Sequence, residues 1–214
     1  MEHQYGWGSP KKSEMKEEYK AYKHNPPHLF IKSSKYFITA STYKRKPYLK
    51  LSFTKERLIW SLQKEFNRYS WEIEDWVILD NHYHLMVNAP ENPHSLPDIF
   101  KEVHRFTALW IKKNMNLKNR ESINRIDDAS TRLMRSKSSE KIFYNYWDTC
   151  ITYEKSYYAC LNYIWYNPVK HGYVDSPEKW YFGSYYNRFQ EEMEDMNQIV
   201  EKYPFDKVKI KDDF

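Results

Sequence analysis

Two strand-like runs stand back to back near the middle of the chain, and only Asp80-Asn81 separates them. Both runs are dense in aromatic and β-branched residues, which favour strands. A two-residue connection between such runs is typical of a β-hairpin, whose strands pair antiparallel. The hairpin therefore limits the fold to one built around a sheet that contains both strands.

Side chains alternate between the two faces of a strand, so each run can be divided by face. In the first run we expect one apolar set on a common face: Trp71, Ile73, Val77 and Leu79. The second run divides into Tyr83, Leu85 and Val87 on one face and His82, His84 and Met86 on the other. His82 and His84 should therefore project to the same side, at the start of the second strand.

Further elements before and after the hairpin predict an α+β fold. Residues 35–43 are typical of a strand, and apolar residues recur at helical spacing in 54–69. After the hairpin, the same spacing predicts a long helix from Leu96 to about Met115, and residues 142–152 again favour a strand. The order β-α-β-β-α-β matches a ferredoxin-like sandwich with a central antiparallel sheet.

A last helix is expected over about 154–166, where Pro168 helps to end it and Gly172 permits a turn. Tyr163 and Asn167 are four residues apart. On a helix such residues lie on one stripe, with Cβ atoms ~5–6 Å apart, so a hydroxyl and an amide oxygen can face a common point.

The length of 214 residues suits one domain with appended ends. We expect a peripheral N-terminal arm over 1–34, a folded body over 35–190 and a peripheral C-terminal tail over 191–214. No run of ~18 apolar residues and no secretory signal pattern occurs, so neither export nor a membrane span is expected. Two cysteines without a CxxC pair argue against a disulfide framework or a thiolate zinc site and fit a reducing cytoplasm.

The net charge of +5 makes the chain moderately basic, and its aromatic content of 18% can serve both core packing and stacking on bases. Basic residues gather beside the first strand, at the end of the long helix and in the stretch 116–140, which is expected to be a mobile basic loop. Any one of them is equally well explained as a solvated surface charge. The candidates for contact with phosphates are Lys44, Arg45, Lys46, Lys112, Lys113, Lys118, Arg120, Arg132, Arg135 and Lys170.

Taken alone, each candidate for chemistry has an ordinary structural explanation. His82 and His84 are a metal-binding pair, or two histidines that are hydrogen-bonded or lie at the surface. Tyr163 is one of 20 tyrosines and by default a packed aromatic, and Asn167 before Pro168 is by default a residue of a helix end.

Three stretches taken together resemble a known family, the single-tyrosine HUH transposases, and within it the REP-associated tyrosine transposases. The stretches are 76–84, which contains His-Tyr-His, then 143–150, and 163–174, which reads YIWYNPVKHGYV and is the most specific. The resemblance spans about 35–189. Family members often carry a proline before the histidines, where this chain has Asp80-Asn81.

The resemblance implies that His82 and His84 bind a divalent metal, Mg²⁺ or Mn²⁺, that Asn167 completes the protein ligands, and that Tyr163 is the nucleophile. It implies cleavage and transfer of single-stranded or hairpin DNA through a 5′-phosphotyrosine intermediate, by a cytoplasmic, nucleoid-associated protein. Whether such a protein is a monomer or a homodimer stays open. Two other functions compete: a catalytically silent DNA-binding protein on the same fold, and a metal-dependent hydrolase that uses water and does not need Tyr163.

Overall fold

The structure is a computed structural model, and it describes residues 19–20, 28–123, 140–188 and 199–203. Its strands and α-helices include, in chain order, β1 (Tyr19–Lys20), β2 (His28–Leu29), β3 (Lys35–Thr42), α1 (Ser52–Arg68), β4 (Glu72–Ile78), β5 (His82–Asn88), α2 (Leu96–Ile123), β6 (Phe143–Ile151), α4 (Glu154–Lys170) and α5 (Ser184–Arg188).

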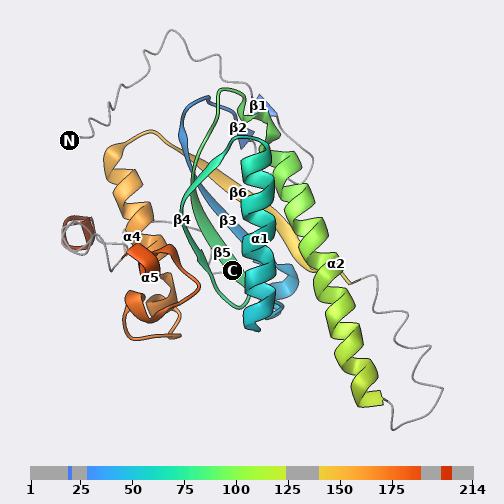
Figure 1. Cartoon of the computed structure of the whole chain (residues 1–214). Helices are drawn as coiled ribbons and strands as arrows, with labels where there is room; N and C mark the ends of the chain where they lie inside the picture. Colours follow the sequence, from blue (N-terminus) through green and yellow to red (C-terminus); the bar gives the residue numbers. More distant parts are fainter. Residues whose placement is uncertain (1–18, 21–27, 124–139, 189–198, 204–214) are drawn as a thin grey trace.

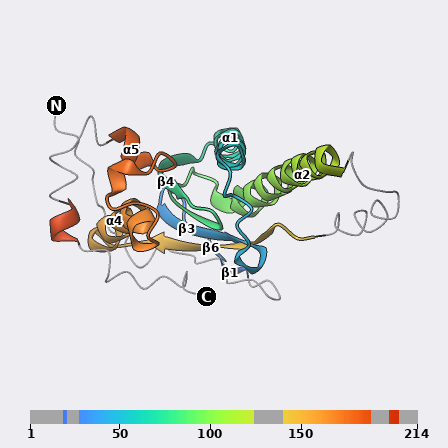
Figure 2. The same cartoon turned by 90° about the horizontal axis from the view of Figure 1, so that it is seen from below.

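A four-stranded sheet in the order β4-β5-β3-β6 forms the centre of the molecule, and all its neighbouring strands are antiparallel. Helices α1 and α2 lie over one face and α4 lies on the other side, as the two views in Figures 1 and 2 show. The predicted α+β fold, a ferredoxin-like β-α-β-β-α-β sandwich followed by a helix that carries Tyr163, matches this arrangement.

Each face of the sheet has its own apolar core, as the alternation of side chains along the strands requires. Tyr83, Leu85 and Val87 of β5 point towards α1 and α2, while Met86 points towards α4. The predicted division of β5 by face is therefore confirmed. The core under α4 also contains Phe37, Leu79, Ile151, Leu161, Tyr163, Ile164 and Trp165.

The predicted division of the preceding strand by face is wrong. The pairing of β4 with β5 shifts register between Ile73 and Asp75, which is a β-bulge. As a result Trp71 and Ile73 pack with α1 and α2, whereas Val77 and Leu79 pack under α4. Because of this one extra residue, the side chains after the bulge point to the opposite face of the sheet from the one predicted.

The bulge also turns a charged residue inward. Asp75 is fully buried; its carboxylate accepts hydrogen bonds from the indole Nε1 of Trp165 at 3.0 Å and from the hydroxyl of Ser184. Arg188 of α5 forms an ion pair with it at 3.0 Å. Burial is the main cause that raises the pKa of Asp75 to about 6, while Arg188 opposes the rise. This network fixes α4 and α5 to the sheet.

Two helices are longer than predicted. Helix α2 continues to Ile123, and α4 runs through Pro168 to Lys170 rather than ending near Tyr166. A proline so close to a helix end removes only one backbone donor, and three later bonds close the turn. These join the amides of 171, 172 and 173 to the carbonyl oxygens of 167, 169 and 168 at 3.1, 2.9 and 2.9 Å. Gly172 has φ +70°, the left-handed conformation that the predicted turn requires.

Among the described residues no helix is long and apolar enough to cross a membrane. Of the predicted N-terminal arm the structure describes Tyr19–Lys20 and residues 28–34, with β1 and β2 paired as a small separate sheet. The division into arm, body and tail stays a prediction.

Candidate functional site

Strand β5 places two histidines side by side under α4. His82 and His84 lie at the first and third positions of this strand, which is paired with β3 on one side and β4 on the other. Both are buried, with 1% and 0% exposure, and their ring centroids are 5.3 Å apart. The spacing of two residues that suggested a shared site is therefore realised on the α4 face of the sheet.

Each histidine is oriented through its Nδ1 atom. His82 Nδ1 is 2.7 Å from Asn81 Oδ1, and His84 Nδ1 is 2.9 Å from the hydroxyl of Thr39 on β3. Such contacts fix the ring and direct Nε2 towards a ligand, as is usual for metal-binding histidines. Nothing in the spacing of the sequence revealed Thr39, because its place opposite His84 depends on the register of β3 against β5.

The histidines are held neutral. Burial is the main cause that lowers the pKa of His82 to about 3, and the charges of His171 and Arg45 add to it. Burial likewise lowers the pKa of His84 well below its ordinary value, with His82 as the next cause. A neutral imidazole is the form that can bind a metal ion.

Helix α4 brings the second half of the site. Asn167 Oδ1 lies 3.1 Å from His82 Nε2, and the ring of Tyr163 lies 5.2 Å from that of His84, at an interplanar angle of 85°. Both α4 side chains are buried. The structure thus brings together Tyr163, Asn167, His82 and His84 from two segments about 80 residues apart.

The contacts of His82 fit a cation. Both of its ring nitrogens face acceptor oxygens, those of Asn81 and Asn167. A neutral imidazole has one N–H, so with the amides in these orientations only one of the two contacts can be a hydrogen bond; the other requires a shared cation or an amide turned to present its NH₂. The 3.1 Å between His82 Nε2 and Asn167 Oδ1 is compatible both with an ordinary hydrogen bond and with two ligands of one metal ion.

A metal ion here would need the amide as well as the imidazoles. In the ranges that the structure describes, no group of three or more His, Cys, Asp or Glu side chains could hold a metal ion. Two imidazoles and an amide oxygen form a mixed nitrogen and oxygen donor set, which Mn²⁺ tolerates and Mg²⁺ accepts less readily.

Tyr163 is packed against apolar and cationic neighbours. The centroid of its ring lies 6.1 Å from that of Phe37. The ammonium of Lys170 donates a hydrogen bond of 3.3 Å to its hydroxyl. The same ammonium lies 4.9 Å from the ring centroid of Tyr163. The ring centroid of His171 lies 4.8 Å from that of His82. A developing phenolate at Tyr163 would therefore meet a positive charge.

The predicted phosphate-binding residues divide by position. Lys44 and Arg45 lie just beyond β3. The charge of Arg45 contributes to lowering the pKa of His82 and of His84. Lys46 forms an ion pair with Glu140. The stretch expected to be a basic loop begins as helix, since α2 extends to Ile123. Lys112, Lys113, Lys118 and Arg120 lie on α2, and Arg132 and Arg135 lie outside the described residues.

The sequence of this chain is similar to those of known transposases. Residues 30–123 match the family described as "Transposase IS200 like". A putative REP-associated tyrosine transposase of Haemophilus influenzae is 26% identical over 165 residues, which cover 77% of this chain and 86% of that protein. The REP-associated tyrosine transposase of Escherichia coli is 24% identical over 158 residues, 73% of this chain and 79% of that one.

The resemblance to the REP-associated tyrosine transposases is confirmed. The predicted class, a transposase enzyme, is confirmed with it. A solved REP-associated tyrosine transposase, bound to a REP hairpin, matches the fold with a TM-score of 0.58 and 21% identity, covering 91% of this chain and 94% of that one. At this identity the match bears on the fold and leaves residue roles open.

Proposed function

We propose that this protein cuts and rejoins single-stranded DNA at a hairpin, with Tyr163 as the nucleophile and a divalent metal held by His82, His84 and Asn167. The convergence of these four side chains in one buried place carries the proposal. The relative solved with a REP hairpin supports hairpin DNA as the substrate. In this proposal residues 35–190 form the catalytic domain, and the protein acts on DNA in the nucleoid.

The reaction would be a transesterification. The Tyr163 hydroxyl oxygen attacks the phosphorus and loses its proton, the bond from phosphorus to the 3′-oxygen breaks, and that oxygen takes up a proton. The 5′-phosphotyrosine keeps the energy of the broken bond, so a 3′-hydroxyl can later displace the tyrosine without ATP. A bound metal would withdraw charge from a nonbridging phosphate oxygen.

Residues of this chain have separate tasks in that scheme. Lys170, which donates to the Tyr163 hydroxyl at 3.3 Å, favours negative charge on the oxygen as its proton leaves. Thr39 and Asn81 hold the two imidazoles in place through their Nδ1 atoms. The residues proposed to contact the DNA backbone are Lys44, Arg45, Lys46, Lys112, Lys113, Lys118, Arg120, Arg132, Arg135 and Lys170.

The test is a covalent adduct. Labelled hairpin DNA with single-stranded flanks is incubated with the protein and Mn²⁺ or Mg²⁺, and then separated under denaturing conditions. The wild type should form an adduct that chelation prevents, and Tyr163→Phe should form none. Tyr157→Phe is the matched control, because Tyr157 is a buried tyrosine on the same helix whose hydroxyl bonds to Glu74 instead.

The competing functions give other patterns. Hairpin binding without any adduct would support the catalytically silent DNA-binding protein. Cleavage without an adduct, equal in wild type and Tyr163→Phe, would support a hydrolase that uses water. An adduct that persists in Tyr163→Phe would show that another side chain is the nucleophile.

A further inference from the structure

A large aromatic side chain lies exposed on the same face of the sheet as the candidate site. Trp147 of β6 has 50% of its surface exposed. It pairs directly with Thr39 of β3, and Thr39 pairs on its other side with His84 of β5. Trp147, Thr39 and His84 therefore form one row across three neighbouring strands.

The face of this row follows from its neighbours. Ile151, four positions after Trp147 on β6, belongs to the core under α4, as does Phe37, two positions before Thr39 on β3. Side chains two or four apart on a strand share a face. Neighbouring strands are ~4.8 Å apart, so the backbone of Trp147 lies about 10 Å from that of His84, with β3 between them.

Aromatic and basic side chains also gather where β6 begins, three or more residues before Trp147. Tyr144, 41% exposed, has its ring 4.9 Å from that of Tyr43, and the ammonium of Lys141 lies 5.5 Å from the Tyr144 ring. Lys44 lies 5.6 Å from the Tyr43 ring. Exposed aromatic rings among cationic side chains are the combination with which proteins hold single-stranded nucleic acid.

We propose that Trp147 is a stacking platform for an unpaired nucleobase of the DNA strand that is cut at Tyr163. This inference rests on the proposed function and adds a contact with a base to a site otherwise built for a phosphate. A base that stacks on the indole would fix the position of the neighbouring phosphate along the row that leads to His84. Stacking accepts every base, so the platform positions the strand without selecting its sequence.

The test compares DNA with and without bases. The affinity of the full-length protein is measured by fluorescence anisotropy, without divalent metal, for labelled oligothymidylate of about 20 nucleotides and for an abasic strand of equal length. Both strands carry the same phosphate charge, so the ratio of their affinities reports stacking. Trp147→Ala should reduce this ratio about 5–150-fold, the range for loss of one stacked base, and Trp147→Phe should retain most of it.

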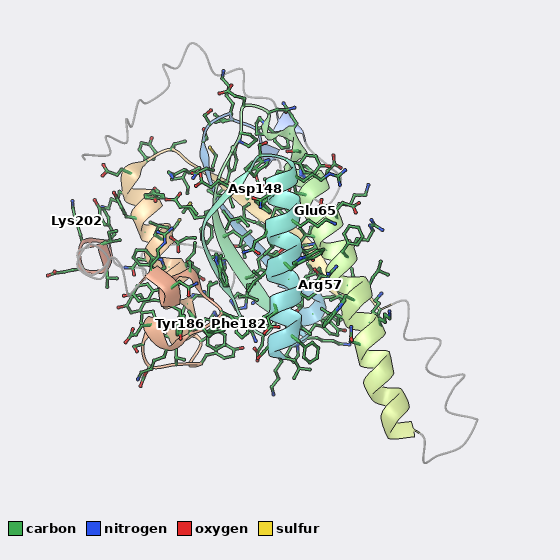
Figure 3. The ribbon with its side chains drawn as sticks, in the orientation of Figure 1. Arg57, Glu65, Asp148, Phe182, Tyr186 and Lys202 are labelled. Carbon is green, nitrogen blue, oxygen red and sulfur yellow. The ribbon has the colours of Figure 1, made fainter. Side chains whose placement is uncertain are left out.

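Trp60 provides a matched control. It is 49% exposed, and it lies on α1, on the other side of the sheet from the site, with the guanidinium of Arg57 4.3 Å from its ring. Arg57 marks that part of α1 in Figure 3. Trp60→Ala removes an equally exposed indole and should leave the ratio unchanged.

The outcomes separate this inference from the proposed function. A ratio that stays the same in Trp147→Ala refutes the platform even if the Tyr163 adduct forms normally. A reduced ratio in a protein that forms no adduct supports the platform and counts against the nuclease activity. If light scattering shows that Trp147→Ala converts a dimer to a monomer while the ratio is unchanged, the exposed edge of β6 is a contact between copies and the platform is wrong.

Discussion

Thr39→Val tests whether the histidine pair is built for a metal. The substitution keeps the shape of the side chain and removes the hydroxyl that lies 2.9 Å from His84 Nδ1. Loss of such an outer contact typically weakens metal binding about 10–100-fold. That factor equals about 1.4–2.7 kcal/mol of binding free energy.

The assay uses metal-induced stabilisation, which does not require DNA or activity. At Mn²⁺ concentrations well above both dissociation constants, the stabilisation of the folded state falls by the full loss in binding free energy. For a chain of this size 1 kcal/mol corresponds to about 2–4 °C, so the rise in Tm caused by Mn²⁺ should shrink by about 3–11 °C.

Thr107→Val is the control for the general cost of removing a buried hydroxyl. Thr107 is fully buried and donates a hydrogen bond of 3.2 Å to Ser61 Oγ, away from the histidines. Both variants should lose about 1 kcal/mol without metal, but only Thr39→Val should lose part of the response to Mn²⁺. The absence of a response in the wild type would refute the assignment of a metal site to His82 and His84, and equal responses in both variants would refute the part assigned to Thr39.

Two further predictions concern stability. Because the pKa of Asp75 is raised from 3.8 to about 6 in the folded state, the folded state binds this proton more tightly than the unfolded chain. The carboxyl's contribution to the free energy of unfolding should therefore fall by about 2 kcal/mol as pH rises from about 4 to 7. Urea titrations should show this fall relative to Asp75→Asn, and parallel pH profiles would contradict it. Gly172→Ala should lower the free energy of unfolding by about 1–2 kcal/mol in the same titrations, because φ is +70° although the space around a new Cβ is empty. Gly172→Asn should lower it less. An unchanged urea midpoint in both variants would contradict the backbone strain.

The parts of the fold that follow from local periodicity could be predicted. The two-residue alternation in 82–88 placed Tyr83 in one core and His84 under α4, and both placements agree with the structure. The order of the strands and helices followed from the same reasoning. These features depend on residues close together in the sequence, which is why the sequence pattern is sufficient.

Features that depend on distant residues could not be predicted. The inward position of Asp75 depends on Ser184 and Arg188, more than 100 residues later in the sequence. The part played by Thr39 depends on strand register, which the pattern of one strand does not determine. The contact between His82 and Asn167 required the packing of α4 on the sheet, and it was suggested by resemblance rather than by spacing.

The bulge in β4 has a consequence for changes in chain length. β5 pairs without interruption with β3, from Lys35 opposite Asn88 to Ser41 opposite His82. A single inserted or deleted residue within β5 would move Tyr83 into the place of a histidine and a histidine into the apolar core. β4, at the edge of the sheet, already carries an extra residue between Ile73 and Asp75. Related chains should therefore differ in length around this bulge, while the count of residues from His82 to Asn88 stays constant.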